Sequence, residues 1–180
     1  MLLQSKQKEQ RRPTGRTIAY AGVLVALAMI FSYIEVLVPF NFGIPGIKLG
    51  LANLVIVVGL YLLSPQEVLV ISLVRIFLSA ALFGNTMSLL YSLAGGILSF
   101  IVMLGLKRIK GFSVIGVSIA GGIAHNIGQL MAAICVVENL SLVTYLPVLL
   151  VAGVLTGFLI GILSHQILRV MHNRSKQLKI

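Results

Sequence analysis

Long apolar stretches alternate with short polar segments along the whole chain, and this alternation predicts its architecture. A helix that crosses a lipid bilayer needs about 20 predominantly apolar residues. Six stretches approach that length, and they are residues 17–38, 48–63, 66–83, 86–106, 114–137 and 145–169. The second and third are short and are separated by a turn at Ser64 and Pro65. The pattern therefore predicts six transmembrane helices, with a tight hairpin between the second and the third.

The composition supports a membrane environment. Of the 180 residues 58% are hydrophobic and 10% are charged, and the mean hydropathy is +1.07. Such a chain has too little polar surface for a water-soluble globule. We therefore expect an all-α, polytopic membrane protein embedded in the lipid bilayer. It would consist of a basic N-terminal tail (1–16), one six-helix domain (17–170) and a basic C-terminal tail (171–180).

The charges predict an orientation. Fourteen basic residues stand against four acidic ones, for a net charge of +10. Twelve of the basic residues fall in three segments that share one side if six helices alternate, and they are Lys6, Lys8, Arg11, Arg12, Arg16, Lys107, Arg108, Lys110, Arg169, Arg174, Lys176 and Lys179. Basic segments stay cytoplasmic, so both termini are expected inside the cell. No aromatic–basic module accompanies the charge, which argues against a nucleic-acid partner.

Rows of small residues predict how the helices pack, because helices in lipid associate through close backbone approach. Gly153, Gly157 and Gly161 recur at four-residue spacing in the stretch 145–169, and a similar row runs through 114–137. We expect these rows to be seams inside the bundle. The small residues of the first helix, Ala19, Gly22 and Ala26, have two possible roles. They form another internal seam, or they dock a partner membrane protein.

Polar side chains at membrane depth are the candidate functional residues. They are Lys48, Asn53, Arg75, His125, Asn126 and Gln129. An arginine in the middle of a spanning helix is costly and usually faces the bundle interior or a wet cavity. His125 and Gln129 are four residues apart and share a helix face.

Two interpretations of this cluster remain open. In the first, the polar groups are hydrogen-bonding links between helices, and Arg75 pairs with Glu35 or with a helix-end carbonyl. In the second, they line a pocket open to the outside, in which Lys48 and Arg75 favour a carboxylate or phosphate. The loop 38–47, with Phe40 and Phe42, would then fold over the bound molecule.

The sequence argues against catalysis by this chain. It contains no aspartate, so it has neither a DDxxD motif for magnesium-bound diphosphate nor a Ser/His/Asp set. It also has no P-loop pattern, so any ATP hydrolysis must come from partner proteins. Cys135 has no neighbouring ligand set. We expect no enzymatic activity, no cofactor and no metal site.

Three segments give the chain a family resemblance. "GIKLGLANLVIVVGLYLLSPQEVLVISLVRIFLSA", "LLYSLAGGILSF" and "VSIAGGIAHNIGQL" resemble the heptaprenyl diphosphate synthase component I family, also called the Gx transporter family. The match covers about residues 17–165. That family is grouped with the substrate-binding S components of energy-coupling factor (ECF) transporters, which implies six helices, a ligand site near the outer face and a first helix that docks a coupling membrane protein. Members also resemble a subunit encoded beside menaquinone genes and genes of flavin-based extracellular electron transfer in Gram-positive bacteria.

Two functional hypotheses follow. The first is a non-enzymatic S-component-like subunit of the cell membrane, which binds a small anionic or amphipathic molecule from outside for uptake driven by partner ATPases. Its ligand would contact Lys48, Asn53, Arg75, His125, Asn126 and Gln129. The second is a membrane accessory subunit for polyprenyl diphosphate or menaquinone synthesis, or for flavin-based electron transfer. Its partners would be prenyl-synthesis or redox subunits.

Overall fold

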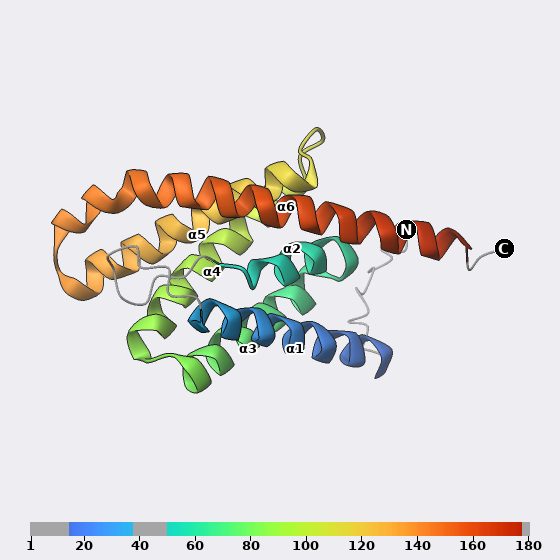
Figure 1. Ribbon diagram of the computed structural model, residues 1–180, viewed down its shortest axis with the longest axis horizontal. Coiled ribbons are helices and arrows are strands. Elements are labelled where there is room, and N and C mark those ends of the chain that lie inside the picture. The colour runs from blue at the N-terminus through green and yellow to red at the C-terminus, as the bar shows by residue number, and fades with distance from the viewer. Residues whose placement is uncertain (1–14, 38–49, 178–180) are drawn as a thin grey trace, which may run out of the picture.

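The computed structural model describes residues 15–37 and 50–177. In these ranges the chain is helical throughout, with short turns between the helices (Figure 1). The elements are α1 (Gly15–Leu37), α2 (Asn53–Leu62), α3 (Pro65–Phe83), α4 (Thr86–Lys107), α5 (Val114–Val137), the 3-10 helix η1 (Leu140–Tyr145) and α6 (Leu146–Gln177). The expected all-α membrane architecture is confirmed at this level.

Five of the described α-helices, all except α2, are long and apolar enough to cross a bilayer. The expected sixth span at 48–63 is not confirmed, because α2 has only 10 residues. At a rise of 1.5 Å per residue it covers about 15 Å, roughly half of a bilayer's apolar core. At the other extreme, α6 has 32 residues and is about 48 Å long. It continues through most of the segment expected to be the C-terminal tail.

Side-chain caps fix where α3 and α4 begin. Ser64 and Glu67 form a capping box at the start of α3, followed by Pro65 in the first turn. Asn85 caps α4, with its Oδ1 accepting a hydrogen bond of 2.9 Å from the Ser88 backbone N–H. Such caps satisfy backbone donors that the first helical turn leaves free. The short polar breaks in the sequence therefore contain the signals that start these helices.

Glycines bring α5 into close contact with both α4 and α6. A Cβ built on Gly128 of α5 would lie 2.7 Å from the Ala94 carbonyl oxygen of α4, and one on Gly157 of α6 would lie 2.7 Å from the Ile119 Cα of α5. Neither distance leaves room for a side chain. The predicted seams of small residues are confirmed, and α4, α5 and α6 form the tightly packed part of the bundle.

The helix α2 lies inside the bundle, and α1 lies at its edge. Residues 52–60 are all buried. By contrast, much of α1 is exposed, and it packs mainly on α3, where the Tyr33 and Phe83 rings stack in a tilted pair with centroids 5.2 Å apart. α2 therefore belongs to the packed interior of the bundle, whereas α1 covers it only in part.

Basic residues gather at one end of the bundle. The start of α1 and the end of α6 lie at the same end in Figure 1, and Lys107 ends α4. The Lys107 ammonium donates a hydrogen bond to the Leu60 carbonyl and lies 5.2 Å from the centre of the Tyr61 ring. We call the described residues Lys107, Arg108, Lys110, Arg169 and Arg174 the basic end. Its cytoplasmic location remains a prediction from the charge rule.

Candidate functional site

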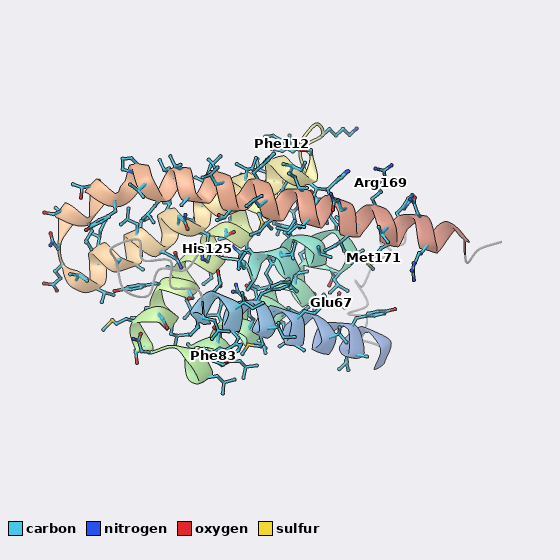
Figure 2. The ribbon with its side chains drawn as sticks, viewed as in Figure 1. Glu67, Phe83, Phe112, His125, Arg169 and Met171 are labelled. Carbon is cyan, nitrogen blue, oxygen red and sulfur yellow. The ribbon has the colours of Figure 1, made fainter. Side chains whose placement is uncertain are left out.

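All five predicted site residues in the described ranges are buried. They come from α2, α3 and α5, and they are Asn53, Arg75, His125, Asn126 and Gln129. The sixth, Lys48, lies outside the described residues, as does the loop with Phe40 and Phe42. In Figure 2, His125 lies in the half of the molecule away from Arg169. The polar cluster is therefore inside the bundle, away from the basic end.

Arg75 on α3 is the charged centre of the cluster. Its side chain is 6% exposed, and its Nη2 donates a long hydrogen bond of 3.5 Å to Asn53 Oδ1 of α2. Its buried Nε has no hydrogen-bond partner among the described residues. A guanidinium offers five N–H donors in a fixed plane. Asn53 therefore satisfies only a small part of what Arg75 can donate.

Glu35 of α1 brings a negative charge toward this arginine. Its Oε1 accepts hydrogen bonds from the backbone N–H groups of Gly50 and Leu51, the latter at 2.7 Å. Gly50 has φ +85°, a left-handed conformation that glycine adopts readily. Glu35 also attracts Arg75 electrostatically. The Glu35 carboxylate therefore stabilises the turn before α2 by hydrogen bonding and partly offsets the positive charge of Arg75.

His125 and Gln129 of α5 face α4 at Gly95. A Cβ on Gly95 would lie 2.8 Å from Gln129 Cγ and 3.0 Å from His125 Nδ1, so the glycine is what lets these side chains fit. Gln129 is fully buried, and neither its Oε1 nor its Nε2 has a hydrogen-bond partner in the described part of the chain. A buried polar group left unsatisfied costs about 1–3 kcal/mol. Gln129 is therefore the least satisfied polar side chain in the cluster.

Asn126 has a different environment from its neighbour His125. Its Nδ2 donates a hydrogen bond of 2.7 Å to the Leu149 carbonyl of α6. This bond joins α5 to α6 inside the bundle. Asn126 thus acts as a link between helices, as in the first interpretation of the cluster, while Arg75 and Gln129 retain unused hydrogen-bonding capacity.

A very small cavity adjoins the cluster. About 10 Å³ of free space lies beside Asn53, between α2, α4, α5 and α6. That is close to the minimum needed for one water molecule. Gly50, in the turn before α2, packs beside Asn53 and His125 at this cluster.

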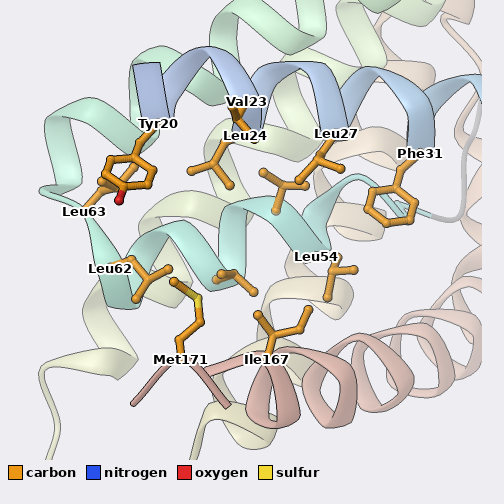
Figure 3. A pocket seen from close by; sticks show the side chains of 12 residues that line it. Tyr20, Val23, Leu24, Leu27, Phe31, Leu54, Leu62, Leu63, Ile167 and Met171 are labelled. Atoms are coloured by element: carbon orange, nitrogen blue, oxygen red, sulfur yellow. The ribbon is translucent and has the colours of Figure 1, made fainter. Parts of the chain in front are cut away.

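A much larger hollow, which the sequence did not predict, lies between α1, α2 and α6 (Figure 3). It measures about 570 Å³ and has an almost wholly apolar lining. Four of its residues, Tyr20, Leu24, Leu27 and Phe31, recur on one face of α1. That row is visible in the sequence, but lipid-facing helices carry similar rows. We call this hollow the apolar groove.

The small residues of α1 lie on another face of that helix. Ala19, Gly22 and Ala26 are exposed, and a Cβ on Gly22 would meet no atom within 4 Å. They therefore do not form a seam within the described bundle. Docking of a partner there stays a prediction.

The comparisons with known proteins identify a family. The sequence profile of the family described as heptaprenyl diphosphate synthase component I matches residues 24–167. No curated protein and no solved structure matches the chain. The matched segment begins within α1, ends within α6 and contains the whole described polar cluster. The chain therefore belongs to the heptaprenyl diphosphate synthase component I family.

Proposed function

We propose that this protein is a non-enzymatic subunit of the cell membrane that binds a small anionic or amphipathic molecule from the outer side. In this proposal it resembles an ECF S component, and uptake is driven by partner ATPases that a coupling membrane protein connects to it. The exposed small-residue face of α1, formed by Ala19, Gly22 and Ala26, would dock that coupling protein.

One observation carries the proposal, namely the unused hydrogen-bonding capacity of buried groups at the cluster. Both amide atoms of Gln129 and the Nε of Arg75 lack partners among the described residues. Native proteins rarely leave buried polar atoms unpaired, and each exception calls for an explanation. A bound polar molecule would supply the missing partners.

The chemistry of the cluster indicates the class of ligand. Arg75 would hold a carboxylate or phosphate oxygen, because charge-assisted hydrogen bonds to a guanidinium are strong and directional. Gln129, His125 and Asn53 would orient the ligand by neutral hydrogen bonds. Lys48 would add a second positive charge from outside the described residues. Glu35 lowers the net charge of the site, so a ligand with few negative charges fits best.

The alternative is an accessory subunit for polyprenyl diphosphate or menaquinone synthesis, or for flavin-based electron transfer. The description of the matching family favours it, since that description names a synthase component. The absence of aspartate from the sequence supports an accessory role over catalysis, because diphosphate chemistry with magnesium relies on carboxylate ligands. In this alternative the polar cluster only links helices.

Gentle purification from the native membrane would separate the two functions. Small molecules retained by the protein would be identified by mass spectrometry, for the unsubstituted chain and for Arg75→Leu. The exposed Arg108, at the basic end, supplies the matched control Arg108→Leu. We expect a retained polar molecule that Arg75→Leu loses and Arg108→Leu keeps, together with ATPases and a coupling protein. Redox or prenyl-synthesis proteins with no retained molecule would establish the alternative instead.

A further inference from the structure

The apolar groove opens between α1 and α6, with α2 as its floor (Figure 3). Tyr20, Leu62 and Met171 lie at one end of it, and Phe31 and Leu54 at the other. Its lining is large aliphatic and aromatic side chains with almost no polar surface. A groove of this kind is suited to a hydrocarbon chain.

The length of the groove matches one half of a bilayer. From Tyr20 to Phe31, α1 advances eleven residues, or about 16 Å at 1.5 Å per residue. One leaflet contributes about half of the roughly 30 Å apolar core. The short α2 has the same extent. The groove therefore accommodates a lipid chain from a single leaflet.

A second hollow continues the groove at the basic end. It measures about 750 Å³, and it shares Leu62 and Met171 with the apolar groove. Its other lining residues include His165, Arg169 and His172. Figure 2 shows Arg169 and Met171 at this end of the molecule. The two hollows together present an apolar channel that leads to a cationic mouth.

The acidic residue Glu67 is held in a helix cap. Glu67 lies near this end, and its Oε2 accepts hydrogen bonds of 2.8 Å from both the backbone N–H and the hydroxyl of Ser64. It is thus engaged in the cap of α3. Arg169 is exposed at the mouth, and Arg side chains recognise phosphate oxygens in a bidentate manner.

We propose that the groove and its mouth bind one anionic phospholipid of the cytoplasmic leaflet. One acyl chain lies in the groove along Leu24 and Leu27, and the headgroup phosphate contacts Arg169. The cytoplasmic leaflet carries the anionic lipids, and basic residues near its surface attract them. This site is separate from the polar cluster and does not depend on the function proposed for that cluster.

The lining argues against other occupants. Transmembrane partner helices dock through small residues that allow close backbone approach, whereas the groove is lined by leucine, phenylalanine, tyrosine and methionine side chains. A free soluble anion would use the mouth but leave the apolar groove empty. An anionic lipid uses both parts.

The test uses the complete lack of tryptophan in the chain. The variant Phe31→Trp places a single fluorophore in the groove and keeps an aromatic ring there. The protein is reconstituted in vesicles of unlabelled phosphatidylcholine. Two lipids brominated on their acyl chains, phosphatidylglycerol and phosphatidylcholine, are then titrated in separate experiments. Bromine quenches tryptophan on contact, so the two titrations give the relative affinity of the groove for the anionic and the neutral lipid.

We expect the groove to bind phosphatidylglycerol more tightly than phosphatidylcholine. In the Phe31→Trp background, Arg169→Gln should reduce that preference by about fivefold, because this is the effect of roughly one positive charge near the membrane surface. Arg169→Lys should retain most of it. Arg108→Gln removes an exposed charge from the same end of the bundle outside the two hollows and should leave it unchanged.

Three results would overturn the proposal. Equal affinity for the two lipids would show that the groove holds ordinary bilayer lipid. Equal losses in the Arg169 and Arg108 variants would show only diffuse attraction to the basic end. Absence of quenching by either lipid would mean that protein, such as residues 1–14 of this chain, fills the groove.

Discussion

Replacing Gly157 by alanine tests how the tight half of the bundle is held together. The added Cβ would lie 2.7 Å from the Ile119 Cα and 2.8 Å from the Ser118 carbonyl oxygen. Both atoms belong to the backbone of α5, so no side chain can rotate away to make room. The methyl group can be accommodated only if α5 and α6 move apart.

The size of that movement sets the expected loss of stability. Ordinary van der Waals contact for a Cβ begins at 3.4 Å, so the helices must separate locally by about 0.7 Å. A gap of 0.5–1 Å forfeits about a quarter to a half of each contact's dispersion energy. Overpacking of a close-packed interior costs about 1–3 kcal/mol. This corresponds to a roughly 5- to 150-fold change in the folding equilibrium.

Two further glycines calibrate the measurement. At Gly153 the nearest atoms to a built Cβ are 3.0 Å away, and at Gly22 on α1 there is nothing within 4 Å. We therefore expect the loss of stability to decrease from Gly157→Ala to Gly153→Ala, and to vanish for Gly22→Ala. At Gly22 the higher helix propensity of alanine favours a small gain in stability.

The assay is reversible unfolding in mixed micelles of increasing sodium dodecyl sulfate content. The folded fraction at each step is measured by its resistance to protease. The unfolding midpoint should fall for Gly157→Ala and stay near the unsubstituted value for Gly22→Ala. If the three alanine variants unfold together, the backbone contact between α5 and α6 does not limit stability, and the packing argument is wrong.

The same assay checks three smaller effects. Asn126→Leu removes the hydrogen bond to the Leu149 carbonyl and should cost about 0.6–1.7 kcal/mol; an unchanged midpoint would mean that the bond contributes nothing. Glu35→Gln weakens the charge-assisted hydrogen bond to the Leu51 N–H and should destabilise the protein by about 1–3 kcal/mol. A gain in stability would show that burying the carboxylate costs more than this hydrogen bond contributes. Ser64→Ala removes the cap of α3 and should cost about 1 kcal/mol, and no loss would show that solvent satisfies the freed N–H.

The helix boundaries were predictable because the residues that determine a helix end lie next to that end in the sequence. The stretch 114–137 is α5 residue for residue, and 86–106 ends one residue before α4 does. Capping residues such as Asn85 and Ser113 lie directly before these apolar runs, and a cap acts within three residues of its own position. The rows of glycine in α5 and α6 were equally readable, because a four-residue repeat places them on one face.

Two features of the fold were not predictable from the same signals. Hydropathy counts apolar residues, and it cannot tell that α2 is a half-length helix buried inside the bundle rather than a full span. The apolar groove depends on the distance between α1 and α6, and no local sequence pattern in either helix predicts that distance. Large apolar residues on α1 are compatible with contact to protein, to lipid or to both.

The polar cluster shows the same limit at the level of single side chains. His125 and Asn126 are neighbours in the sequence, and both are buried, yet one packs against Gly95 of α4 and the other bonds to Leu149 of α6. A rotation of 100° per residue sends them to different helices. Linking and binding therefore need not be competing interpretations of one cluster. On α5 the residue that faces α6 already has its partner, while Gln129, on the side of α4, does not. The proposed ligand would therefore lie on the α4 side of α5, where Gln129 still has hydrogen bonds to make.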